Sequence, residues 1–251
     1  MLTAVLLAGC AAPQPDAAPP AVLIFGEAHD QPDQQRQVAD TVSALAREGR
    51  LAAVVLEMAE RGRDTRGLPR DADAARVREA LAWTGWPWDA YAAVVLRAVQ
   101  AGVPVLGGNA PRSGHRAAMA DTTLDATLPA AARDKLAEAV RTGHCGLLPA
   151  SQEPGMVRIQ IARDRAMAAT VQAALQQARP GQQVLLLTGA QHAARDRGVP
   201  LHLAPGTPLR VVMFGGGAAT LPADEQRPAQ ATPRPDPCEA LRQRMQGRPA
   251  G

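Results

Sequence analysis

Short apolar runs alternate with longer amphipathic stretches along the chain. The runs have the length and continuity of strands buried on both faces of a parallel sheet. They span 21–25, 52–56, 103–106 and 184–187, with a further run at 211–214. The stretches between the first four runs place apolar residues at helical spacing and span 33–48, 72–83, 89–101, 130–141 and 156–178. This alternation predicts an α/β fold with a mostly parallel sheet and helices on both of its faces.

Capping residues lie close to several of the predicted helix ends. Asp71 and Asp89 are expected N-caps, because a short side-chain acceptor there satisfies a free backbone N–H of the first turn. Gly49, Gly102 and Gly181 lie where helices are expected to stop. These residues set the expected limits of the helices.

The two ends of the chain differ in composition from the middle. Residues 1–10, MLTAVLLAGC, join an apolar run to small residues before Cys10, which resembles the lipobox of a bacterial lipoprotein. We therefore expect a signal peptide over 1–10, lipidation of Cys10, and an anchor in the bacterial cell envelope on the periplasmic or outer-membrane face. The run is short and no Lys or Arg precedes it, which a start codon annotated too late would explain, and a frayed apolar start of a cytosolic protein is the alternative.

The anchor is expected to carry one domain on a tether. Residues 11–20 are rich in Ala and Pro, which is typical of an extended linker. The α/β domain is expected over 21–218. Residues 219–251 are rich in Pro, Arg and Gln with little apolar periodicity, so we expect a largely disordered tail.

The composition of the chain argues against one class of partner but does not identify the chemistry of a site. The chain of 251 residues is 46% hydrophobic but only 2% aromatic, so its core must consist mainly of Ala, Val and Leu. Its net charge of +3 comes from scattered Arg residues without a basic stripe, which argues against nucleic-acid binding. Cys145 and Cys238 have neither CxxC nor CxxCH spacing, and in an oxidising compartment they are either paired or free thiols.

Polar side chains follow four of the predicted strands. Ligands of open parallel sheets bind beyond the carboxyl ends of the strands, where the connecting loops meet. The first and fourth strands are each followed by Gly-x-x-His, and we expect each glycine to let the backbone turn sharply toward the site. We therefore predict one shared pocket built from Glu27, His29, Glu57, Asn109, Arg112 and His192.

These residue types permit several kinds of chemistry. Glu27, His29, Glu57 and His192 could bind a divalent metal such as Zn, Mn or Fe, or form a metal-free acid–base pair. Asn109 and Arg112 suit contacts to an oxyanion or a carboxylate. Purely structural roles are open for each, such as helix capping by the glutamates. His115 and His144 are weaker candidates, and His202 is expected to be structural.

Six motifs together resemble the ChaN-like haem-binding lipoproteins, which share a superfamily with Tiki-type peptidases and erythromycin esterases. The motifs, spread over about residues 21–213, are GEAHD (26–30), LEM (56–58), WPWDAY (86–91), NAPR (109–112), QIARDRAMA (160–168) and TGAQHAARDRGVP (188–200). The resemblance implies a membrane-anchored protein of haem and iron acquisition that holds haem as a cofacial pair in a homodimer with tyrosine ligation. Tyr91 is the one tyrosine of the chain, and a phenolate is a plausible ligand of ferric haem. The alternative is a tyrosine on a helix face that packs beside Trp83, Trp86 and Trp88.

The resemblance and the residues leave more than one function open. Haem binding would use Tyr91, His29 or His192 as iron ligand, with Arg112 near a propionate. The hydrolases of the superfamily use the same Gly-x-x-His and Glu positions, so a metal-dependent peptidase or esterase is the alternative. A third interpretation is a non-catalytic interaction module. Because the motifs resemble a haem-binding family, we favour a binding protein over an enzyme.

Overall fold

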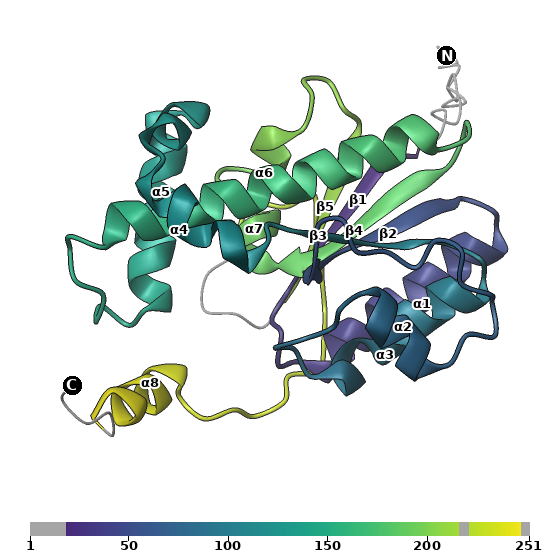
Figure 1. The fold of residues 1–251 in the computed structure, drawn as a ribbon, viewed down its shortest axis with the longest axis horizontal. Coiled ribbons are helices and arrows are strands. Elements are labelled where there is room, and N and C mark those ends of the chain that lie inside the picture. Colours follow the sequence, from purple (N-terminus) through teal and green to yellow (C-terminus); the bar gives the residue numbers. More distant parts are fainter. Residues whose placement is uncertain (1–18, 216–220, 247–251) are drawn as a thin grey trace, which may run out of the picture.

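Six parallel strands form one sheet, and helices cover both of its faces in the computed structural model (Figure 1). The structure describes residues 19–215 and 221–246, so the expected signal peptide with Cys10 and almost all of the expected tether lie outside the described residues. The strand order is β3-β2-β4-β1-β5-β6. The strands are β1 (Val22–Glu27), β2 (Leu51–Glu60), β3 (Val105–Asn109), β4 (Gln183–Gly189), β5 (Leu209–Phe214) and β6 (Glu225–Arg227). The predicted α/β fold is confirmed.

The helices alternate with the strands much as the apolar periodicity predicts. They are α1 (Pro32–Arg47), α2 (Ala74–Ala80), α3 (Trp88–Gln100), α4 (His115–Ala120), α5 (Ala130–Gly143), α6 (Glu153–Gln177), α7 (Ala190–Ala193) and α8 (Pro237–Gln246). Short 3₁₀ helices span Arg112–Gly114, Thr122–Thr127 and Val199–His202. The short segments α4 and α7 lack enough turns to show a periodic pattern, and they were not predicted.

Side chains alternate between the two faces of each central strand, and this alternation divides the core. Leu23 and Phe25 pack toward α1 and α3, whereas Val22 and Ile24 pack toward α6 and α7. Both sets are buried, which explains why the strands are continuous apolar runs. Helices α5 and α6 enclose a third, smaller core around Leu136 and Ile161.

The helix ends differ in detail from the expectation. Asp73, rather than Asp71, is the N-cap of α2, because its carboxylate accepts the Arg76 N–H at 2.8 Å. Helix α3 begins at Trp88, so Asp89 lies inside its first turn and Pro87 is the N-cap. The three expected stops are glycines in the left-handed region, with φ of 68° at Gly49, 75° at Gly102 and 82° at Gly181.

The C-terminal segment has more structure than its composition predicts. Strand β6 pairs in parallel with β5, α8 follows, and Cys238 forms a disulfide with Cys145, 93 residues earlier. Within 221–246 the regular elements are β6 and α8, and residues 228–236 between them are neither helix nor strand. Backbone pairing and a disulfide do not require apolar periodicity, so the composition gives no sign of them. No helix of the described ranges is long and apolar enough to cross a membrane.

Candidate functional site

A pocket of about 1020 Å³ opens at the carboxyl ends of β1, β2, β3 and β4. All six residues predicted for the shared pocket line it: Glu27, His29, Glu57, Asn109, Arg112 and His192. Parallel strands place their carboxyl ends at one edge of the sheet, and the loops that follow them meet there. The structure therefore brings together the residues that the strand-end argument selected.

Glu57 lies at the centre of this group. It is 2% exposed, and its Oε2 accepts hydrogen bonds from the Thr188 hydroxyl and the Gly189 N–H, both at 2.7 Å. The Arg163 guanidinium forms a hydrogen-bonded ion pair with Oε1. Each buried oxygen of the carboxylate thus has a partner, and the group is held in a single orientation.

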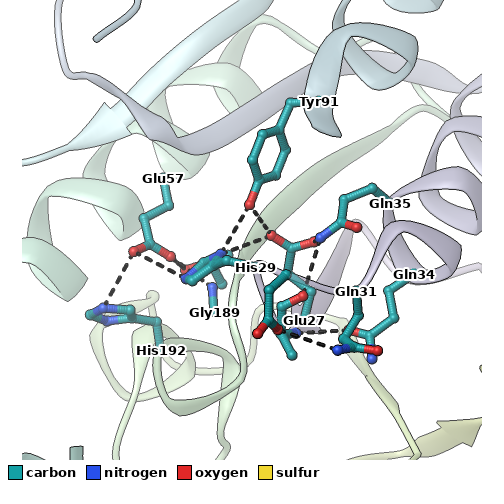
Figure 2. A network of polar contacts seen from close by, with 12 residues as sticks. Glu27, His29, Gln31, Gln34, Gln35, Glu57, Tyr91, Gly189 and His192 are labelled. Carbon is teal, nitrogen blue, oxygen red and sulfur yellow. Dashed lines mark hydrogen bonds and ion pairs between the residues drawn. The ribbon is translucent and has the colours of Figure 1, made fainter. Parts of the chain in front are cut away.

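Two imidazoles, those of His29 and His192, approach Glu57 from different sides (Figure 2). Each imidazole also contacts a second carboxylate through its other ring nitrogen. The Nδ1 of His29 lies 2.9 Å from Glu27 Oε1, and its Nε2 lies 4.0 Å from Glu57 Oε1. The Nδ1 of His192 lies 2.6 Å from Asp164 Oδ1, and its Nε2 lies 3.8 Å from Glu57 Oε1. When Nδ1–H donates to the outer carboxylate, the lone pair of Nε2 is directed inward.

The charges of this cluster shift its acid–base behaviour. Burial opposes ionisation of Glu57, but the charges of His192, Arg163 and His29 outweigh it and hold the pKa of Glu57 well below its ordinary value. Burial raises the pKa of Glu27. Burial would lower the pKa of His29, but its hydrogen bond to Glu27 and the charge of Glu57 raise it. At neutral pH Glu57 is therefore an anion between two imidazoles.

Asn109 ties the cluster to the edge of the sheet. Its amide donates to the Glu57 carbonyl at 2.9 Å, and its side-chain oxygen accepts from Arg163 Nε at 3.0 Å. Asn109 therefore positions Arg163, which in turn holds Glu57. Across the described residues no group of three or more His, Cys, Asp or Glu side chains is arranged to hold a metal ion.

The glycines of the two Gly-x-x-His motifs serve close packing rather than a sharp turn. Neither Gly26 nor Gly189 has a positive φ. A Cβ on Gly189 would lie 2.9 Å from His29 Nε2, and a Cβ on Gly26 would lie 2.7 Å from the Ala193 Cβ. The expected turn is therefore wrong, and these glycines are needed because other side chains approach the strand ends too closely for a methyl group.

Tyr91 lies behind the pocket. Its side chain comes from α3 and is fully buried, and its hydroxyl donates to Glu27 Oε1 at 2.7 Å and lies 3.1 Å from His29 Nδ1 (Figure 2). Burial and the adjacent Glu27 carboxylate raise the pKa of Tyr91 well above its ordinary value, so the phenolate is disfavoured. In this arrangement the tyrosine orients the Glu27–His29 pair.

The rim of the pocket adds cations and apolar surface. The Arg112 side chain lies over Gly85, and no carboxylate of the described residues forms an ion pair with it. Arg234 also lines the pocket and pairs with Asp30. The apolar part of the lining consists of Ala28, Met58, Ala59, Ala82, Trp86, Ala110 and Ala190. His115 lines the pocket too, whereas His144 and His202 lie outside it.

Four residues that complete the site were not among the predicted ones. They are Arg163 and Asp164 on α6, Thr188 on β4 and Gln35 on α1, whose side-chain amide donates to Glu27. The sequence could have indicated that Asp164 is buried. It follows Ile161 by three residues and precedes Ala168 by four, which places it on the apolar face of α6. A carboxylate at such a position is buried only when it has a partner, and here the partner is His192.

Comparisons with known proteins identify the family and the fold of the chain. The model of a family of haem-binding uptake proteins, Tiki superfamily, ChaN, matches residues 15–203. The structure of ChaN of Campylobacter jejuni, described for its cofacial heme binding, is similar with a TM-score of 0.63 and 22% identity. That match covers 80% of this chain and 84% of the other, and it shows that the two share a fold.

Other comparisons add little. The type III effector HopBA1 matches with a TM-score of 0.40 and 12% identity, over 84% of this chain and 88% of that one. No curated protein matches the sequence. The family match, which spans most of the chain, and the shared fold together lead to one conclusion: this chain belongs to the ChaN family of haem-binding uptake proteins in the Tiki superfamily.

Proposed function

We propose that this chain binds haem in the pocket at the carboxyl ends of the strands and takes part in haem or iron acquisition. The observation that carries the proposal is His29, whose Nδ1 is held by Glu27 while its ring reaches the pocket. Its side chain is 34% exposed, against 10% for His192. Of the two paired imidazoles, His29 is therefore the more accessible to a ligand.

The lining of the pocket fits the chemistry of haem. Ligand pockets in proteins usually enclose about 300–1000 Å³, so 1020 Å³ is room for a large ligand. Trp86 and Met58 provide apolar surface for a porphyrin face, and His29 provides an imidazole. Arg112, free of protein carboxylates among the described residues, suits a propionate. Bound haem would supply the iron centre that is the cargo of uptake.

A histidine is favoured over Tyr91 as the iron ligand. The Tyr91 hydroxyl has no exposed surface, and it already donates to Glu27. Ligation by its phenolate would require loss of that hydrogen bond and movement of α3 or of the Glu27–His29 pair. His29 needs neither, because its Nδ1 is the nitrogen that Glu27 holds.

Two features support an anchored protein of the bacterial envelope. Residues 1–10 resemble a lipoprotein signal that ends at Cys10, and the Cys145–Cys238 disulfide is typical of an oxidising compartment. We expect Cys10→Ala to abolish incorporation of labelled palmitate and to release the protein from the membrane fraction. An unchanged membrane fraction in this variant would contradict a lipid anchor.

Titration of the purified full-length protein with hemin, followed at the Soret band, tests haem binding. We expect a saturable shift that is weakened at least about tenfold by His29→Gln and about threefold to tenfold by Arg112→Gln. Arg97→Gln is the matched control, since Arg97 forms an exposed ion pair with Asp40 away from the pocket lining. Absence of a saturable shift, or equal affinity in all variants, would contradict the proposal.

The arrangement offers no comparable support for a metal-dependent hydrolase. Glu57, the central carboxylate, is already paired with Arg163, Thr188 and Gly189. A divalent cation there would have to displace the Arg163 guanidinium. The described residues also lack a cluster of three ligand side chains with the required geometry.

A further inference from the structure

An extended segment of the C-terminal region, residues 228–238, runs beside the start of α1. We call it the strap. Polar side chains of the 30–37 region hold its backbone at several points along its length. Gln37 donates to the Pro228 carbonyl at 3.0 Å, and the Gln230 N–H donates to Asp33 at 2.7 Å. These contacts attach the first half of the strap to the start of α1, directly after the pocket residues Glu27, Ala28 and His29.

Gln31 and Asp30 continue this attachment toward the pocket. The Gln31 side chain accepts the Thr232 N–H at 2.7 Å and donates to the Thr232 carbonyl at 3.1 Å. Both Asp30 oxygens accept from Arg234, at 2.9 and 3.1 Å. Arg234 itself lines the pocket, so the strap reaches the site at this residue.

The other end of the strap is fixed beside the end of α5. Cys238 forms its disulfide with Cys145, which lies two residues after α5 ends at Gly143, and Gly143 also lines the pocket. Figure 1 shows the same path, with the yellow segment leaving the region of α1 and ending in α8 on the side of α5. The strap therefore runs from the start of α1 to the end of α5 and meets the rim of the pocket at Arg234.

We propose that the strap is a cover, covalently held in place, that limits exchange between the pocket and solvent and presents Arg234 to the acidic groups of the ligand. The identity of that ligand rests on the proposed haem binding, whereas the covering role does not. A dithiol reductant would release the cover by transferring two electrons and two protons to the disulfide. The products are two protein thiols and the oxidised reductant, which is itself now a disulfide.

The disulfide is the strongest of the attachments. Strap residues 231–237 are exposed, and exposed hydrogen bonds and ion pairs contribute little because water competes for the same groups. Prolines at 228, 233 and 235 keep the strap extended as far as α8, which begins at Pro237. Without the covalent bond, only this set of weak contacts would hold it over the pocket.

The ligand-free test measures how fast diethylpyrocarbonate modifies His29, with His202, outside the pocket, as the internal reference. The variants are the double change Cys145→Ser/Cys238→Ser and, with the disulfide intact, Gln31→Ala. We expect the His29 rate to rise about tenfold in the double variant and to a smaller extent in Gln31→Ala, while the His202 rate stays constant. Treatment of the wild type with dithiothreitol should reproduce the effect of the double variant.

A second measurement uses hemin as the probe. Transfer of bound hemin to an excess of apo-globin should be about tenfold faster in the double variant and severalfold faster in Arg234→Gln, with Arg97→Gln as control. Circular dichroism verifies folding, and Gln31→Ala keeps the test decisive if the double variant unfolds. Unchanged His29 modification in folded Gln31→Ala and in the reduced wild type would overturn the proposal. Failure of the wild type to bind hemin would instead overturn the proposed function, and the His29 rates would still decide the role of the strap.

Discussion

Tyr91→Phe separates a structural role of this tyrosine from iron ligation. The change removes a hydroxyl that is fully buried and donates to Glu27 at 2.7 Å. A hydrogen bond to a charged acceptor contributes about 1.5–3 kcal/mol, because the acceptor left behind cannot be rehydrated when it is buried. Gln35 and His29 continue to hold Glu27, which places the expected loss in this range rather than above it.

Urea denaturation followed by circular dichroism measures that loss. We expect the midpoint to fall and the slope m to stay constant, since the compactness of neither state changes. Ser43→Ala is the matched control, because the Ser43 hydroxyl bonds only the Ala39 carbonyl of its own helix, and its loss should change stability by less than about 0.5 kcal/mol.

Hemin binding by Tyr91→Phe tests whether Tyr91 ligates iron. Since the Tyr91 hydroxyl does not reach the pocket, we expect Tyr91→Phe to keep the Soret maximum and to change the affinity by less than about threefold. A stable variant that loses hemin or shifts the Soret band would show that Tyr91 ligates iron. Such a result would require the buried arrangement of Glu27, His29 and Tyr91 to open on binding.

Three further predictions concern the cluster around Glu57. Glu57→Gln leaves the half-buried Arg163 charge without its carboxylate, and we expect chemical denaturation to show a loss toward the lower end of about 3–5 kcal/mol. Because the folded pKa of Glu57 is depressed, this contribution should be fully present above the ordinary value of 4.5, decline below it and be lost as the pH falls through the depressed value. Gly189→Ala places a methyl group 2.9 Å from His29 Nε2, so it should cost about 1–3 kcal/mol in the same assay and weaken hemin binding as well. The raised pKa of His29 means that protons compete with iron for Nε2, so hemin titrations between pH 6 and 9 should show affinity rising with pH in the wild type but not in His29→Gln.

Most of the sheet could be predicted because its strands are buried on both faces. Runs such as 21–25 and 184–187 are apolar without interruption, and a strand of that kind is visible in a single sequence. The shared pocket followed from the same runs, since the residue after each strand had to lie at the same edge. Strand β6 could not be found this way, because its three residues pair through the backbone and carry only polar side chains.

The residues that were missed depend on tertiary packing. Asp164 stands between Arg163 and Arg165, so the local sequence suggests a solvated helix face, although its spacing from Ile161 and Ala168 places it inside. Whether Tyr91 faces the pocket or lies behind it depends on how α3 packs against α1, and no local pattern reports that contact. Pairing of Cys145 with Cys238 is equally non-local, at a sequence separation of 93 residues.

The most direct test of the account is a resonance Raman spectrum of the ferric hemin complex of the full-length protein. The account predicts a spectrum without iron–tyrosinate bands. It also predicts that the bands that report haem ligation change in His29→Gln and stay the same in Tyr91→Phe. An iron–tyrosinate band that disappears in Tyr91→Phe and persists in His29→Gln would contradict it.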